Sequence, residues 1–157
     1  EISVRLRLTD RKVDLTTEGI DLAFFLGQPE DSNLRIRKIA DVDRVLCASP
    51  SYIETYGNPA TGEEVVADGH ECLNLRFPGA TEFQWRLMSA DGPKKYRVVG
   101  RYESDDGDVL TDWALSGNGI AMKPIFEVSD HIKAGRLVPV AVNTPPEPIQ
   151  MACLYQT

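Results

Sequence analysis

The sequence has few of the residues that form disulfides or bind metals, with three cysteines and two histidines among 157 residues. The cysteines, Cys47, Cys72 and Cys153, are odd in number and widely spaced, which argues against a disulfide framework. No pair of cysteine or histidine residues has the spacing of a zinc site. We therefore expect buried, reduced thiols and no metal or other cofactor, with a redox-sensing cysteine as the alternative.

Long apolar runs and clusters of basic residues are also missing. Charged residues interrupt each apolar stretch before it is long enough to span a bilayer, and residues 1–5 lack the hydrophobic region of a secretory signal. The formal net charge is −7, so the chain has no positive field to attract a nucleic-acid backbone. We predict a cytoplasmic protein without membrane association, and a chain that does not itself bind DNA.

The sequence contains no recognisable catalytic motif. It has no GxSxG, no HExxH and no glycine-rich phosphate loop. His70, beside Glu71 and Cys72, and His131, in a predicted helix, have no evident nucleophile to activate. We interpret both histidines as surface or supporting residues and predict that the protein is not an enzyme.

What the sequence does contain is an alternation of strand and helix patterns, which predicts an α/β fold. Residues 2–8 alternate apolar and polar side chains, as a half-buried strand does. Asp10 offers an N-cap for a helix over residues 11–18, and Gly19 would end it. Residues 20–26 form a short apolar run that is typical of a strand covered on both faces. We expect these segments to form a right-handed β-α-β unit in a parallel sheet.

The rest of the chain continues this alternation. Ser49-Pro50 and the acidic segment 104–108 have the composition of helix starts, and Asp91-Gly92 is a hairpin signal between two strands. The expected strands are residues 34–39, 44–48, 72–76, 83–87, 96–102, 120–122, 137–142 and 149–155. The expected helices start near residues 50, 104 and 125, and a short helical turn is expected within residues 59–68.

Four pairs of segments, in order along the chain, carry a family resemblance. They are TDRKVDL with EGIDLA, DSNL with CASPSY, HECL with Trp85, and GNGIAMKP with GRLV. In this order and spacing they resemble the effector-binding domain of LysR-type transcriptional regulators. The pattern is most similar to the subgroup that includes glycine-cleavage activators.

The resemblance implies a periplasmic-binding-protein type II fold, in which two α/β lobes are joined by two crossover strands. It assigns residues 1–43 and 124–157 to lobe I and residues 44–123 to lobe II. Family members also carry an N-terminal helix-turn-helix and a linker helix, which this sequence does not include, and further elements at both edges of the sensing domain. We therefore expect a fold that is incomplete at its N-terminal and C-terminal edges.

The resemblance also implies a function. The chain would sense a small-molecule metabolite between the lobes and control transcription in the full-length protein, which would contact DNA only through its N-terminal domain. We expect a homodimer, and a tetramer when the protein is full-length. A solute-binding receptor of the same fold is the alternative, and it would carry a secretory signal where a regulator carries a helix-turn-helix.

Ligands of open α/β sheets bind beyond the carboxyl ends of the strands. This rule points to the loops after Leu26, Arg76 and Tyr102. The predicted effector-binding residues are Leu26, Gly27, Ser32, Phe77, Pro78, Gly79, Ser104, Asp105, Lys123 and Pro124. Phe77 is open to either ligand contact or packing, whereas Trp85 is expected in the core.

The last of these loops is acidic, because Glu103, Asp105, Asp106 and Asp108 lie at a predicted helix start. Carboxylates interact favourably with that end of a helix dipole, and they would repel an anionic effector. We therefore hypothesise a neutral or amine-bearing effector, unless Arg76 or Lys123 offsets the acids. Simple capping of a solvated helix is the alternative interpretation.

Overall fold

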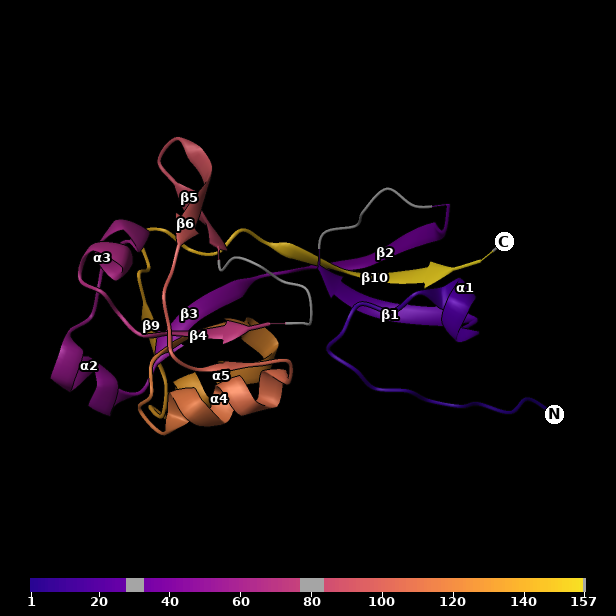
Figure 1. Cartoon of the computed structure of the whole chain (residues 1–157), viewed down its shortest axis with the longest axis horizontal. Coiled ribbons are helices and arrows are strands. Elements are labelled where there is room, and N and C mark those ends of the chain that lie inside the picture. Colours follow the sequence, from indigo (N-terminus) through magenta and orange to yellow (C-terminus); the bar gives the residue numbers. More distant parts are fainter. Residues whose placement is uncertain (28–32, 77–83, 157) are drawn as a thin grey trace.

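The computed structural model describes residues 1–27, 33–76 and 84–156. These residues form two bodies, each built on a β-sheet, that lie end to end (Figure 1). We call the body on the three-stranded sheet the small lobe and the body on the five-stranded sheet the large lobe. The small lobe contains α1 (Leu15–Glu18), β1 (Leu22–Gly27), β2 (Arg35–Val42) and β10 (Ile149–Tyr155).

The large lobe has the strand order β7-β4-β8-β3-β9, with the two-stranded β5-β6 hairpin beside it. Its strands are β3 (Arg44–Ala48), β4 (Cys72–Leu75), β5 (Gln84–Ser89), β6 (Gly92–Arg97), β7 (Glu103–Ser104), β8 (Ile120–Pro124) and β9 (Val138–Val140). Its helices are α2 (Pro50–Tyr56), α3 (Gly62–Ala67), α4 (Gly107–Leu115) and α5 (Ile125–Lys133). β4 runs parallel to β7 and β8, whereas β3 is antiparallel to β8 and β9.

The five-stranded sheet is covered on both faces, because successive side chains of a strand point to opposite faces. On β3, Leu46 packs in the cluster that contains residues of α2, α3 and the hairpin, while Cys47 packs in the cluster that contains residues of α4 and α5. On β4, Cys72 packs in the first of these clusters and Leu73 packs in the second. Trp85 is buried in the first cluster, which confirms its predicted core position.

The three cysteines are buried and unpaired, as predicted. Burial raises the pKa of the Cys47 and Cys72 thiols to about 12. At neutral pH these two residues are therefore thiols rather than reactive thiolates. This environment does not favour the redox-sensing alternative for Cys47 or Cys72.

The small lobe differs from the predicted β-α-β unit. β10 lies between β1 and β2 and is antiparallel to both. β1 alternates exposed and partly covered side chains, so the expectation of a strand covered on both faces is wrong. An apolar run of this length does not distinguish a parallel strand from an antiparallel one.

Residues 2–8 were also expected to form a strand, and this prediction is wrong. They are extended but carry no ladder hydrogen bonds, and Ile2 and Val4 are 91% and 83% exposed. A strand needs a neighbour for its backbone groups, and no strand among the described residues lies against this segment. The first helix also begins later than predicted, because Asp14 rather than Asp10 caps α1.

Most other elements are confirmed with small changes at their ends. Ser49 caps α2 by accepting a hydrogen bond from the Tyr52 amide. The β5-β6 hairpin turns at Ala90-Asp91, one residue earlier than the predicted Asp91-Gly92, and Gly92 pairs with Ser89 as the first residue of β6. The returning strand of this hairpin is β6, which ends at Arg97, earlier than the predicted residue 102. No helix in the described ranges is both long and apolar enough to cross a bilayer.

The chain passes between the two lobes twice. The first crossing is the step from β2 to β3, and the second is the segment 141–148 between β9 and β10. Arg44 joins the crossings, since its guanidinium donates a 2.8 Å hydrogen bond to the Glu147 carbonyl. Because β9 pairs with β3, the sheet extends through residue 140, whereas the predicted return to lobe I was at residue 124.

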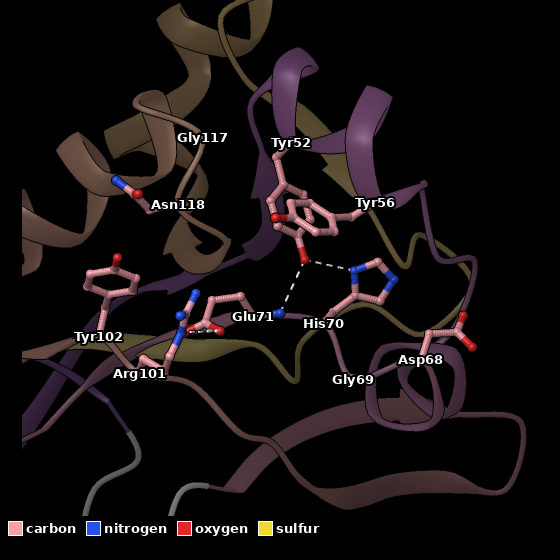
Figure 2. Close-up of a pocket in the computed structure, with 10 residues that line it drawn as sticks. All are labelled: Tyr52, Tyr56, Asp68, Gly69, His70, Glu71, Arg101, Tyr102, Gly117 and Asn118. Carbon is pink, nitrogen blue, oxygen red and sulfur yellow. Dashed lines mark hydrogen bonds and ion pairs between the residues drawn. The ribbon is translucent and has the colours of Figure 1, made fainter.

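A buried polar pair attaches α2 to the start of β4 (Figure 2). The Tyr52 hydroxyl lies 2.8 Å from Nδ1 of His70 and accepts a 3.2 Å hydrogen bond from the Glu71 amide. Burial lowers the pKa of His70, although the Asp68 and Glu64 carboxylates act in the opposite direction. His70 is therefore a neutral supporting residue at pH 7, in agreement with its predicted role.

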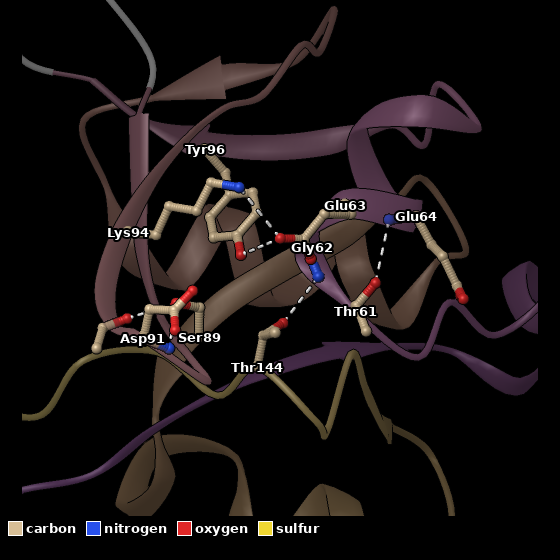
Figure 3. A network of polar contacts seen from close by, with 10 residues as sticks. Thr61, Gly62, Glu63, Glu64, Ser89, Asp91, Lys94, Tyr96 and Thr144 are labelled. Atoms are coloured by element: carbon tan, nitrogen blue, oxygen red, sulfur yellow. Dashed lines mark hydrogen bonds and ion pairs between the residues drawn. The ribbon is translucent and has the colours of Figure 1, made fainter.

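The first turn of α3 joins the β5-β6 hairpin and the segment 141–148 to the large lobe (Figure 3). The amide of Gly62 donates to the Thr144 hydroxyl at 2.7 Å, and the Tyr96 hydroxyl donates to the Glu63 carboxylate at 2.7 Å. A Cβ atom at Gly62 would lie 2.8 Å from Cδ1 of Leu87 and 2.9 Å from Cε1 of Tyr96. Glycine is therefore the residue that allows α3 to approach the hairpin this closely.

We expect Gly62→Ala to lower the free energy of unfolding by about 1–3 kcal/mol, because the added methyl group overfills this contact. Urea unfolding would measure the change. Leu87→Val, which shortens the opposing side chain, should cost about 1 kcal/mol alone. The double variant should lose less stability than the sum of the two single losses. Strictly additive losses would contradict the proposed contact.

The lowered pKa of His70 predicts a pH dependence of stability. In the unfolded chain the pKa of His70 is near 6.5. In the folded chain burial lowers the pKa of His70. Stability contributed by neutral His70 is therefore present above pH 6.5 and lost as the pH falls. The Tm of the wild type should fall more between pH 7 and pH 5 than the Tm of His70→Gln. An equal fall in Tm for the two proteins would show that His70 does not contribute to the pH dependence of stability.

Candidate functional site

A cavity of about 520 Å³ lies between the lobes, at the edge of the large sheet where β4, β7 and β8 end. One wall comes from the segment that precedes α1, and the other comes from the start of α4 and from α5. The lining residues are Leu8, Thr9, Asp10, Arg11, Asp105, Asp106, Gly107, Asp108 and Glu127. The carboxyl ends of parallel strands meet at this edge, which is where ligands of open α/β sheets bind.

The start of α4 forms the centre of this cavity. Asp106 is the N-cap, and its carboxylate accepts a 2.9 Å hydrogen bond from the Asp108 amide. The Gly107 amide donates a 2.7 Å hydrogen bond to Oδ2 of Asp10, which lies 97 positions earlier in the chain. A carboxylate of the small lobe thus occupies the helix start, where an anion would otherwise be stabilised.

Lys123 binds the first turn of α4 through the backbone carbonyl of Gly107. Its side chain is only 4% exposed, its Nζ donates a 2.8 Å hydrogen bond to the Gly107 carbonyl, and the same atom lies 2.7 Å from the Glu127 carboxylate. A buried ammonium requires such partners, because an unpaired buried charge is costly. Its charge is therefore largely neutralised within the protein.

A second contact between the walls is the ion pair of Arg11 and Asp105, with a distance of 3.2 Å. Both side chains are exposed, so we expect this pair to contribute less than about 1 kcal/mol. Arg76, the other basic residue considered as a balance for the acids, pairs with Glu103 at 3.0 Å and does not line the cavity. Among the described residues, no group of three or more acidic, histidine or cysteine side chains is arranged to hold a metal ion.

The predicted site residues fall in three groups. Asp105 lines the cavity, Lys123 contacts Gly107 in its wall, and the hydroxyl of Ser104 accepts a hydrogen bond from the Asp106 amide at 3.1 Å. Leu26 at the end of β1 and Pro124 at the end of β8 are not among the lining residues, and neither is Gly27. The predictions for Ser32, Phe77, Pro78 and Gly79 lie outside the described residues.

Sequence reasoning missed the contributions of Asp10 and Arg11. The sequence predicts Asp10 as the cap of its own helix, yet its carboxylate accepts a hydrogen bond from the first amide of α4 in the other lobe. The local sequence carries no signal for this difference, because an aspartate before a helix start has the same composition in both cases. Only the approach of the two lobes identifies its partner.

Two lobes with a polar cavity between them, connected by two crossings, define a ligand-binding domain of the type II periplasmic-binding class. The chain matches the LysR substrate binding domain over residues 1–157, and it belongs to that family. The match confirms the fold class and the family expected from the sequence.

Individual relatives agree with this membership. The HTH-type transcriptional regulator DmlR of Escherichia coli is 35% identical over 140 residues, which cover 89% of this chain and 45% of DmlR. The HTH-type transcriptional regulator CrgA of Neisseria meningitidis serogroup C is 32% identical, over 87% of this chain and 45% of CrgA. The chain thus spans about half the length of these relatives. Neither name supports the predicted nearness to glycine-cleavage activators.

Solved structures show the same arrangement. The full-length virulence activator AphB of Vibrio cholerae superposes with a TM-score of 0.79 at 26% identity, over 99% of this chain and 52% of AphB. CrgA, a LysR-type regulator from Neisseria meningitidis, superposes with a TM-score of 0.74 at 30% identity, over 91% of this chain and 48% of that one.

The Asp10 contact predicts a specific loss on mutation. Asp10→Ala removes the acceptor for the Gly107 amide, so we expect the free energy of unfolding to fall by about 1 kcal/mol. Hydrogen exchange of the Gly107 amide should also become faster. Asp21→Ala, an exposed aspartate of the same lobe, is the control and should change stability by less than about 0.5 kcal/mol. Unchanged exchange at Gly107 would exclude the contact.

Proposed function

We propose that this chain is the effector-sensing part of a LysR-type transcriptional regulator and that its effector binds in the cavity between the lobes. The observation that carries the proposal is the cavity itself, since residues of both lobes line it and Asp10 spans it. A ligand there contacts both lobes, so its affinity depends on how they are arranged. That difference in affinity is what couples binding to a change of shape.

The coupling to DNA binding, the oligomeric state and the cellular location are proposed from membership of the family. In the full-length protein, closure or rotation of the lobes would re-aim DNA-binding domains that lie outside this chain. We propose a homodimer, or a tetramer of the full-length protein, acting on transcription in the cytoplasm. The relatives named above are described as regulators, which favours this function over a solute-binding receptor. We take the large lobe to end near residue 140, where the strand pairing ends.

The charges of the cavity support a neutral or amine-bearing effector. Among the described residues that line it, five carry carboxylates, namely Asp10, Asp105, Asp106, Asp108 and Glu127, and one, Arg11, carries a guanidinium. The buried ammonium of Lys123 is engaged by Glu127, and the first amide of α4 is engaged by Asp10. An anionic effector would have to displace the Asp10 carboxylate or remain among like charges.

Three four-carbon compounds of different charge would test this selectivity by isothermal titration. We expect 1,4-diaminobutane or 1,4-butanediol to bind more tightly than succinate. Asp108→Asn should weaken diamine binding by about two- to fivefold, because an exposed ion pair contributes up to about 1 kcal/mol. Asp112→Asn, on the same helix but away from the cavity, is the matched control. Succinate binding more tightly than both other compounds would overturn the charge argument.

A further inference from the structure

A second cavity, of about 210 Å³, lies at the opposite end of α4 from the interlobe cavity (Figure 2). It is at the edge of the large sheet where β4 and β8 begin. Its lining residues are Tyr52, Tyr56, Asp68, Gly69, His70, Glu71, Arg101, Tyr102, Gly117 and Asn118. All of them belong to the large lobe, so this cavity does not depend on how the lobes are arranged.

The walls of this cavity are held by internal contacts. The Tyr52 and Tyr56 rings pack in a tilted arrangement, with centroids 4.8 Å apart and planes at 37°, and the Tyr52 hydroxyl lies 2.8 Å from Nδ1 of His70. On the other side, Tyr102 packs against Trp113 with centroids 5.5 Å apart. The aromatic walls are therefore positioned before any ligand arrives, which reduces the entropy cost of binding.

Three polar groups of the lining have no hydrogen-bond partner within the part of the chain that the structure describes. The hydroxyls of Tyr56 and Tyr102 and the amide of Asn118 form no side-chain hydrogen bond with any residue in the described ranges. Figure 2 shows the Tyr56 hydroxyl pointing from α2 toward the space between Tyr52 and Tyr102. A hydroxyl and an amide can each both donate and accept, so these groups match a ligand with several hydroxyls.

The charges at this cavity disfavour an anion. Glu71 and Arg101 are paired, with the Arg101 Nε atom 3.5 Å from the Glu71 carboxylate, and the guanidinium lies over the Tyr102 ring at 5.8 Å. Asp68 adds a negative charge, and His70 is neutral at pH 7. The pairing of Arg101 also occupies the carboxylate and the ring face that a ligand ammonium would need most.

From these observations we infer that this cavity is a second ligand site, for a neutral ring polyol the size of one monosaccharide. The apolar parts of the tyrosine rings border the C–H surface of such a ring, while Tyr56, Tyr102 and Asn118 bind its hydroxyls. The volume is below the range of about 300–1,000 Å³ that drug-sized ligands occupy, which fits a small molecule. The site is independent of the interlobe cavity and of the effector proposed there.

D-Glucose, D-glucosamine and D-glucuronate share one ring and differ in charge, so they test the inference directly. Amide chemical shifts of the labelled chain would be followed during titration up to about 50 mM, a range suited to millimolar dissociation constants. We expect glucose to bind most tightly and to move the amides of Gly69, Gly117 and Asn118. Tighter glucosamine or glucuronate, or no binding of all three, would overturn the inference.

Tyr56→Phe removes the hydroxyl of Tyr56 and keeps its ring in the cavity wall. The variant therefore tests the hydroxyl alone, because this exposed group supports no other described residue. Loss of one hydrogen bond should weaken glucose binding about five- to tenfold. Asn118→Ala should have a similar effect. Asp130→Asn, an exposed residue of α5 that lines neither cavity, is the control and should leave glucose affinity unchanged. Equal affinity of Tyr56→Phe and the wild type would exclude the site at this place.

Discussion

The arrangement of the two lobes depends on how Arg44 holds the two crossing segments together. Its guanidinium is largely buried and donates to the Glu147 carbonyl, while the Glu147 carboxylate pairs with Arg86 at 2.8 Å. Burial lowers the pKa of Arg44, and the negative charge of Glu147 opposes that effect. Separating the crossings would break the hydrogen bond between the Arg44 guanidinium and the Glu147 carbonyl. The two crossings are therefore held together at Arg44. Other contacts set how closely the two lobes approach each other.

That approach is set where Asp10 meets the start of α4. The same helix has two different environments at its ends, because β4, β7 and β8 run in one direction. At their carboxyl ends the cavity is shared by both lobes and lined by carboxylates. At the starts of β4 and β8 the cavity belongs to the large lobe alone and is lined by tyrosines and an amide.

The elements of the large lobe could be predicted from the sequence because their signals are local. Ser49-Pro50 and Gly57 delimit α2, the Asp91-Gly92 signal falls within one residue of the hairpin turn at Ala90-Asp91, and Pro124 ends β8 before α5. The small lobe was predicted less well. The apolar run of β1 suits several sheet arrangements, and the alternation of residues 2–8 describes a strand only when a neighbour supplies its hydrogen bonds.

The sequence by itself determined the family, the α/β class and the burial of the cysteines, because these follow from residue order and hydrophobic pattern. Through the strand-end rule it also placed the acidic start of α4 at the edge of the sheet where ligands of this fold class bind. Only the tertiary structure decided that Asp10 accepts a hydrogen bond from the first amide of a helix 97 positions away, that Lys123 is neutralised by Glu127, and that Tyr56, Tyr102 and Asn118 surround one cavity. These contacts join residues distant in the chain, and their partners are chosen by packing rather than by neighbouring sequence.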